Sequence, residues 1–422
     1  MTVKKKSLVI ALATGASLLA TGAASADVLF WSTQAKPVEE AQAMREQVLS
    51  GFSGEVDFQP SDNGPWLTRV NAESEAGSGK IGLLGSLHGN LISLSDDLAD
   101  LSDVDTAGVN STFLELGKLG TDQQKYIPWM QATYIMAANK KALEHLPEGA
   151  DINALSYDQL IEWSRTMAEK TGSPKFGFPA GPKGLKHRFF QGYLYPSYTN
   201  SMVTKFRSSE AELAWNKFKE LWSYTNPGST NFSFMQEQLL TEEVWVVFDH
   251  TARLADAFNT RPDDFVAFPA PAGPTGRGFM PVVVGIAVPG TSPDMAESKA
   301  LLSYLLEPST QINTLKATNF FPVVDVELPD DMPAAVQAAG GAIATMSGSA
   351  DANPGLLPVG MGDLGGKFNA VYVDSFERIV LAGQDVRTVL DDQADALRKL
   401  MEEAGAPCWA PDAASEGACP VD

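Results

Sequence analysis

The chain has 422 residues, of which 44% are hydrophobic and 20% are charged, and its formal net charge at pH 7 is −21. This length suffices for two or three domains and the hydrophobic content for a large core, so the fold does not depend on disulfides or metals. The strong negative charge makes nucleic acid and anionic membrane surfaces poor partners.

The N-terminus has the pattern of a cleavable export signal. The lysines at positions 4–6 precede an apolar run that ends in the small residues at 24–26, so cleavage is expected after Ala26. No later stretch has the roughly 18 uninterrupted apolar residues of a membrane span. No cysteine flanks the cleavage point to carry a lipid anchor. We therefore expect a signal peptide at 1–26 and a free periplasmic protein.

Strands and helices alternate in the first part of the mature chain. The sequence predicts strands at 28–32, 55–59 and 81–84, and helices at 37–49 and 66–76. Such alternation is typical of a mainly parallel sheet covered by helices on both faces.

The stretch 126–140, YIPWMQATYIMAANK, follows these elements. On a strand, Trp129 and Gln131 share one face, because successive side chains alternate. An aromatic ring beside a hydrogen-bonding group suits a sugar, which has an apolar C–H face and a ring of hydroxyls. Taken alone, the stretch is better explained as a half-buried edge strand that Pro128 starts.

The second half of the chain is richer in helices. Ser156 with Gln159, and Ser209 with Glu212, each fit a capping box at a helix start. The other predicted elements are a buried strand at 243–249, a Pro-rich extended segment at 265–273 that resembles a second crossing, a strand at 279–289, and helices at 295–306, 368–381 and 386–404.

Both cysteines, Cys408 and Cys419, lie in the C-terminal tail. In an oxidising compartment we expect them to form a disulfide that closes a short loop. A metal site would need further ligands nearby, and the tail contains no histidine.

Catalytic and cofactor signatures are missing from the sequence. There is no H-E-x-x-H, no G-x-S-x-G and no Walker loop. One match to G-x-G-x-x-G, at Gly360, Gly362 and Gly365, follows too short an apolar run to predict a dinucleotide site. We therefore expect no catalytic residue, cofactor or metal. Two carboxylates from distant parts of the chain, as in a glycoside hydrolase, stay possible.

Polar and aromatic residues follow several predicted strands. Ligands of open α/β sheets bind beyond the carboxyl ends of strands, so these residues are candidates for a site. Each of them also fits a structural role. They are Gln34, Asp62, Trp66, His88, Lys183, Phe190, Asp249, His250 and Arg253.

The order of these pieces resembles a known family. The pieces are VLFWS, YIPWMQATYIMAANK, SYDQLIEWSRTMAEKTG, FPAPAGPTGRGFMPVVVGIAVP and ESKALLSYLLEPSTQINTLKATNFFPVV. From Val28 to Ala404 the chain is similar to the family 1 extracellular solute-binding proteins of bacterial carbohydrate ABC importers, the group to which maltose-binding protein belongs. The chain departs from the family where Gly-Pro-Trp is often found, since it has Asp249, His250 and Thr251 there. The ligand therefore need not be a maltodextrin.

The resemblance implies an α/β, two-lobed periplasmic binding protein fold of type II with the ligand in the cleft between the lobes. Lobe 1 would comprise 27–132 and 272–318, lobe 2 would comprise 133–271 and 319–404, and 405–422 would be the tail. It also implies a monomer that closes on its ligand and then docks on the transmembrane subunits of an ABC permease.

By the same resemblance, residues from both lobes would line the cleft. Gln34, Asp62, Trp66 and His88 would form one wall, Lys183, Phe190, Asp249, His250 and Arg253 the other, and Trp129 and Gln131 the floor. The expected ligand is a sugar, a small glycoside or a polyol. One alternative is a charged solute, either a polyamine or glycerol phosphate, the latter served by Lys183, His187, Arg188 and Arg253. The other is a secreted glycoside hydrolase.

Overall fold

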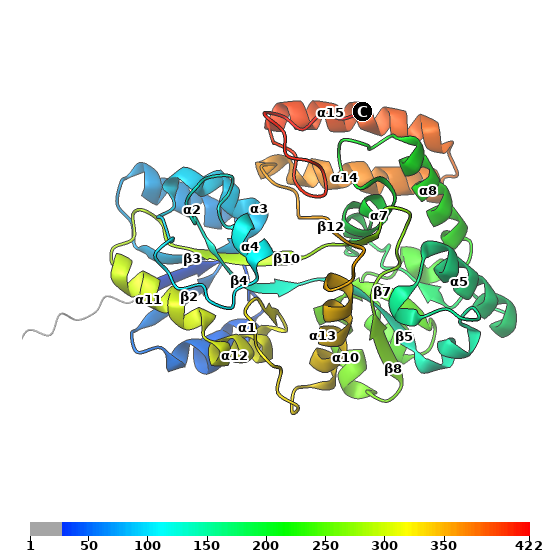
Figure 1. Cartoon of the computed structure of the whole chain (residues 1–422), viewed down its shortest axis with the longest axis horizontal. Coiled ribbons are helices and arrows are strands. Elements are labelled where there is room, and N and C mark those ends of the chain that lie inside the picture. The colour runs from blue at the N-terminus through cyan, green and yellow to red at the C-terminus, as the bar shows by residue number, and fades with distance from the viewer. Residues whose placement is uncertain (1–27) are drawn as a thin grey trace, which may run out of the picture.

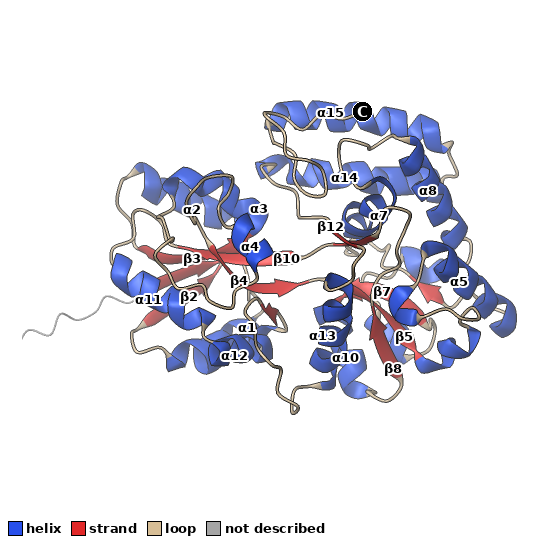
Figure 2. Ribbon diagram, viewed as in Figure 1, coloured by secondary structure: helices blue, strands red, loops and turns tan. Residues whose placement is uncertain are grey.

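Two α/β lobes lie side by side and are joined by strands that run from one to the other (Figure 1). The computed structural model describes residues 28–422, apart from the side chains at 112 and 363. The expected signal peptide at 1–26 lies outside these residues. Figure 2 shows a sheet in each lobe with helices around it.

The first lobe is built on a six-stranded sheet with the order β11-β4-β10-β3-β1-β2. Its strands are β1 (Val28–Ser32), β2 (Val56–Pro60), β3 (Ile81–Leu87), β4 (Ile127–Ala132), β10 (Val282–Ala287) and β11 (Phe321–Pro322). The helices are α1 (Val38–Ala43), α2 (Asn63–Glu75), α3 (His88–Leu91), α4 (Ser111–Leu116), α11 (Met295–Leu306) and α12 (Pro308–Thr318).

This sheet is mixed, whereas the sequence predicted a mainly parallel one. β1 pairs in parallel with β2 and β3, but β10 is antiparallel to both β3 and β4. The reason is that β10 enters the lobe from the side of the second lobe, where β3 ends. Apolar clusters cover both faces of the sheet, one around Phe30, Phe58 and Trp129 and the other around Trp66 and Tyr126.

The second lobe has a four-stranded sheet with the order β6-β7-β5-β8. Its strands are β5 (Tyr134–Asn139), β6 (Phe176–Gly177), β7 (Val246–His250) and β8 (Phe265–Phe268), and β9 (Arg277–Phe279) pairs separately with β12 (Ala352–Pro354). The helices are α5 (Tyr157–Thr171), α6 (Lys186–Phe189), α7 (Tyr195–Thr199), α8 (Ser209–Trp222), α9 (Gln236–Leu240), α10 (Thr251–Thr260), α13 (Ala334–Ser347), α14 (Gly365–Phe376) and α15 (Val386–Ala404).

The two predicted capping boxes have different outcomes. At α5 the prediction is confirmed, because Ser156 and Gln159 each accept a bond from the other's backbone N–H. At α8 it is wrong by one residue. The Ser208 side chain caps this helix by accepting from the backbone of Ala211, and Ser209 is already its first residue.

The segments that cross between the lobes are shorter than the sequence predicted. The first crossing is a single residue, Thr133, between β4 and β5. The second lies at Met280 and Pro281 rather than at 265–273. β8 pairs with β5 and β9 pairs with β12, so the chain stays in the second lobe as far as Phe279.

The C-terminal tail is fastened to the second lobe. The Cys408–Cys419 disulfide is formed, as predicted. Within the loop that it closes, the buried Asp412 carboxylate accepts hydrogen bonds from the backbone N–H groups of residues 202–204 and from two hydroxyls. The carbonyl of Ala410, also in this loop, accepts from the backbone of Leu356.

Candidate ligand site between the lobes

A row of polar side chains lies where β1 and β3 end and the first lobe faces the second. The hydroxyls of Thr33 and Ser86 lie 2.9 Å apart. The Gln34 amide donates to Thr33 over 3.1 Å, and the Asn90 amide donates to Ser86 over 3.0 Å. Gln34 and Asn90 are half-buried and keep unused hydrogen-bonding capacity, and Asn90 lines a cavity between the lobes.

Three predicted residues of this wall have other contacts. Asp62 is exposed and pairs with Lys36 at 2.7 Å. The Trp66 ring is fully buried and its Nε1 donates to the carbonyl of Trp31, so no face of the ring is open to a ligand.

His88, the third of these residues, points into the lobe. Its Nδ1 lies 2.8 Å from the Tyr126 hydroxyl, and the side chain is 7% exposed. Burial lowers the pKa of His88 to about 4, so the imidazole is neutral at pH 7.

The two residues predicted for the cleft floor are separated by the sheet. Trp129 is fully buried against Phe30, with ring centroids 5.3 Å apart, and its Nε1 has no hydrogen-bond partner. Gln131 lies on the opposite face of the sheet, where it lines a cavity and donates to the carbonyl of Pro322 over 3.0 Å. On a regular strand, side chains two residues apart share a face. A bulge in the pairing of β4 with β10 interrupts this alternation and puts Trp129 and Gln131 on opposite faces.

In the second lobe, Asp249, His250 and Arg253 form one cluster. The buried Asp249 carboxylate accepts from the backbone N–H groups of Met235 and His250 and lies 3.7 Å from the Arg253 guanidinium. Burial raises the pKa of Asp249 to about 6 despite the nearby Arg253. Its two backbone bonds join the residues that precede α9 and α10.

The other members of this wall differ in exposure. The His250 ring caps α10 through Nδ1 and packs edge-on against Tyr134, and burial lowers its pKa to about 4. Arg253 lies over the ring of Phe234 and donates to the carbonyl of Ser233. Lys183 is exposed at the surface, whereas Phe190 is fully buried in the core of the lobe.

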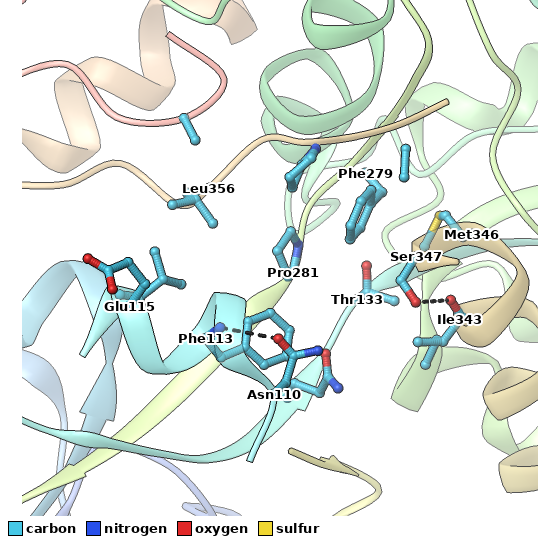
Figure 3. A pocket seen from close by; sticks show the side chains of 15 residues that line it. Asn110, Phe113, Glu115, Thr133, Phe279, Pro281, Ile343, Met346, Ser347 and Leu356 are labelled. Atoms are coloured by element: carbon cyan, nitrogen blue, oxygen red, sulfur yellow. Dashed lines mark hydrogen bonds between the residues drawn. The ribbon is translucent and has the colours of Figure 1, made fainter. Parts of the chain in front are cut away.

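Two cavities lie between the lobes. The larger, of about 590 Å³, adjoins the crossing residues Thr133 and Pro281 and is lined mostly by apolar side chains. Figure 3 shows Ile343, Met346 and Ser347 of α13 on one side of this cavity and Asn110 and Phe113 on the other.

The smaller cavity, of about 120 Å³, is more polar and lies at the end of β3. Leu87, Gly89 and Asn90 line it from the first lobe, while Arg188 and Asn369 line it from the second. Of these, Asn369 was given no role by the sequence, because it lies on α14, more than 250 residues from β3. Only the packing of α14 across the cleft brings it to the site.

Two further features bear on the chemistry. Within residues 28–422 no group of three or more His, Cys, Asp or Glu side chains is arranged to hold a metal ion. Over the same residues, no helix is both long and apolar enough to cross a bilayer.

Several solved structures share this fold. They include the sugar-binding protein MalE from Xanthomonas citri (TM-score 0.69, 14% identity, covering 89% of this chain and 97% of that one). The bacterial solute receptor AcbH, which prefers β-D-galactopyranose, matches with a TM-score of 0.68 and 14% identity over 89% of this chain and 99% of that one. UgpB from Mycobacterium tuberculosis, in complex with glycerophosphocholine, matches with a TM-score of 0.66 and 18% identity over 90% of this chain and 99% of that one.

No curated protein matches the sequence at a significant level. The family model for bacterial extracellular solute-binding proteins matches residues 12–312, which is more than half of the chain. With its two lobes and interlobe cavities, the chain belongs to the family of bacterial extracellular solute-binding proteins.

Proposed function

We propose that this protein binds a sugar, a small glycoside or a polyol between its lobes and delivers it to the permease of an ABC importer. The observation that supports this most is the smaller cavity, which is lined by amide groups of both lobes, Asn90 from one and Asn369 from the other. A solute that contacts both walls binds the closed arrangement better than the open one and so shifts the population towards closure. The closed form is then the one that the permease engages.

The polar row Gln34, Thr33, Ser86 and Asn90 supports a ligand rich in hydroxyl groups. Side-chain amides both donate and accept hydrogen bonds, as sugar hydroxyls do. A site built to bond hydroxyls rejects analogues that lack them, because its polar groups would be left unpaired. The relatives named above include receptors for a hexose and for a glycerophosphodiester, which agrees with a small hydrophilic ligand.

The proposal includes the place and state of the protein. This protein is exported with removal of residues 1–26 and acts as a monomer in the periplasm. The basic segment and apolar run at its N-terminus, together with its family, support export. The ligand leaves unchanged. Asp249, the carboxylate of the second lobe's wall, is fully buried and bonded to two backbone N–H groups, which supports a structural role for it.

A thermal-shift screen of the mature protein against monosaccharides, disaccharides, polyols, glycosyl glycerols and polyamines tests this function. A ligand that binds only the folded state raises the free energy of unfolding by about 2.7 kcal/mol at a hundredfold excess over Kd. We expect a shift with at least one hydroxyl-rich solute and no product on chromatography of the recovered ligand. A shift with polyamines alone, or turnover of a glycoside, contradicts the proposal.

A further inference from the structure

Arg188 carries a positive charge in the cleft that the protein does not neutralise. It lies on α6 and lines the smaller cavity between the lobes. Within residues 28–422, the one hydrogen bond of its side chain is donated by Nη1 to the Oε1 atom of Gln191 over a long 3.4 Å. Among residues 28–422, no ion pair within 4.0 Å involves Arg188. A guanidinium has five N–H donors, so most of its capacity is unused.

The surroundings of Arg188 add positive rather than negative charge. Lys183 and Lys186, in the same segment, form no ion pair among the described residues either, and the Lys186 ammonium donates to a backbone carbonyl. At this wall, Asp249 offsets Arg253 at 3.7 Å. The neighbouring His187 is neutral at pH 7, because burial and the nearby cations lower its pKa to about 3. A local excess of cations is unusual in a chain with a net charge of −21.

Arg188 belongs to a chain of side-chain hydrogen bonds within the second lobe. Gln191, which accepts from Arg188, donates through its own amide to Asn369 over 2.9 Å. This chain of bonds links α6 to α14 beside the cavity that Arg188 and Asn369 line. Arg188 is half-buried, so its charge is partly removed from water, and this burial lowers the pKa of its guanidinium. A partly desolvated cation without a counter-ion is costly, and a bound anion removes that cost.

The cavity has the size and the donors for an anionic group. Its volume of about 120 Å³ exceeds the 10–15 Å³ or so that one water molecule needs, so a group of several oxygen atoms fits. The amide of Asn90 lies on the first lobe's side and that of Asn369 on the second lobe's side, so hydrogen-bond donors reach such a group from both. Guanidinium groups bind phosphate and carboxylate through two parallel hydrogen bonds.

We propose that the solute carries an oxyanion, either a phosphate ester or a carboxylate, which pairs with Arg188 and Asn90 across the smaller cavity. This inference rests on the proposed function and narrows its ligand class. The anion joins the lobes through charge-assisted hydrogen bonds from Arg188 and amide hydrogen bonds from Asn90. A polyamine is disfavoured at the same wall, since its charge has the same sign as that of Arg188.

Calorimetric titration of the mature protein with matched pairs of solutes tests the inference. The pairs are glycerol with glycerol 3-phosphate, and glucose with glucose 1-phosphate and with glucuronate, and inorganic phosphate is titrated alone. We expect at least one anionic member to bind tenfold or more tightly than its neutral parent, because hydrogen bonds to charged groups are worth about tenfold or more in affinity. Preference for the phosphate or for the carboxylate identifies the oxyanion.

Substitution of the arginine localises the effect. Arg188→Gln should weaken binding of the anionic solute by about tenfold to a hundredfold. Arg188→Lys keeps the charge but loses the pair of parallel hydrogen bonds. Its affinity for the anionic solute should lie between those of the wild type and Arg188→Gln. Arg378→Gln is the matched control, because it removes an equal charge from the same lobe at an ion pair with Asp392 outside the cavity. It should leave the affinity unchanged.

The outcomes separate the two proposals. Tight binding of a neutral sugar or polyol, with no anionic preference and no effect of Arg188→Gln, overturns the inference and leaves the proposed function standing. Failure of every solute to bind counts against both. Since the comparison of matched solutes uses the wild-type protein, it decides the matter even if an Arg188 variant folds poorly.

Discussion

The Thr133 hydroxyl donates a hydrogen bond of 2.8 Å to the carbonyl oxygen of Met280 and so joins the first two of the three segments that cross between the lobes; the third runs from β11 to α13. The Tyr193 hydroxyl lies 3.0 Å from the side-chain oxygen of Thr133. It also accepts from the backbone N–H of Tyr134 and bonds to the carbonyl of that residue. All four residues are buried. A tyrosine from the second lobe therefore braces the crossing at Thr133, which is itself bonded to the crossing at Met280.

Replacement of Thr133 by valine should destabilise the protein by about 1–3 kcal/mol, because it leaves the buried Met280 carbonyl without its donor. Thr133→Ser keeps the hydroxyl and should lose much less. Denaturant unfolding monitored by tryptophan fluorescence measures both. Equal stability of the valine variant and the wild type would show that this bond does not support the crossing.

The stability of the protein should fall in mild acid, in part because of His88. Burial lowers its pKa to about 4 in the folded state, against roughly 6.5 in an unfolded chain. Between these two values the unfolded state binds more protons, so protonation favours unfolding and the contribution of the neutral imidazole is lost as the pH decreases. It is fully present above pH 6.5 or so.

Comparison with His88→Gln isolates this effect, since His187, His250 and Asp249 titrate in both proteins. From pH 7 to pH 5 the wild type should lose about 2 kcal/mol more of its unfolding free energy than the variant. Urea titrations at the two pH values measure the difference. Parallel losses would mean that His88 is protonated in the folded state.

The two buried tryptophans of the first lobe should affect stability and not ligand binding. Trp66→Phe removes the bond from Nε1 to the Trp31 carbonyl and should cost about 1 kcal/mol beyond the loss of packing. Trp129→Phe removes a buried N–H that has no partner and should cost less. Both variants should keep the wild-type affinity for the solute. A large loss of affinity in either, measured by calorimetry, would place that ring at the site.

Asp412 should be the most sensitive acidic residue of the C-terminal tail. Its carboxylate accepts from three backbone N–H groups and two hydroxyls at 201–204. Asp412→Ala leaves these donors buried and unpaired and should destabilise by about 3 kcal/mol or more. Asp395→Ala removes only an exposed pair with Arg398 and should change stability by less than about 0.5 kcal/mol. Similar thermal midpoints for the two variants would contradict the assigned role of Asp412.

The sequence by itself determined the elements and the class of fold. Period-two and period-3.6 patterns locate β1, α2 and α15 because these elements bury one face or both against the same cores. The cysteines could be paired because only two are present and they lie near each other. The family resemblance came from the order of such local segments, which folding does not alter, and the family match bears it out.

Only the tertiary structure decided which residues face the cleft. The sequence predicted that the rings of Trp66 and Trp129 line the cleft. Both rings are instead buried in the core, because the helix and sheet faces that carry them pack inward. The position of the second crossing depended on the pairing of β9 with β12, some 75 residues apart in sequence. Among residues 28–422 the Arg188 guanidinium has no ion pair, and no local pattern in the sequence reveals this. A site built from both lobes depends on long-range packing, and the local periodicity of the sequence does not predict which residues meet there.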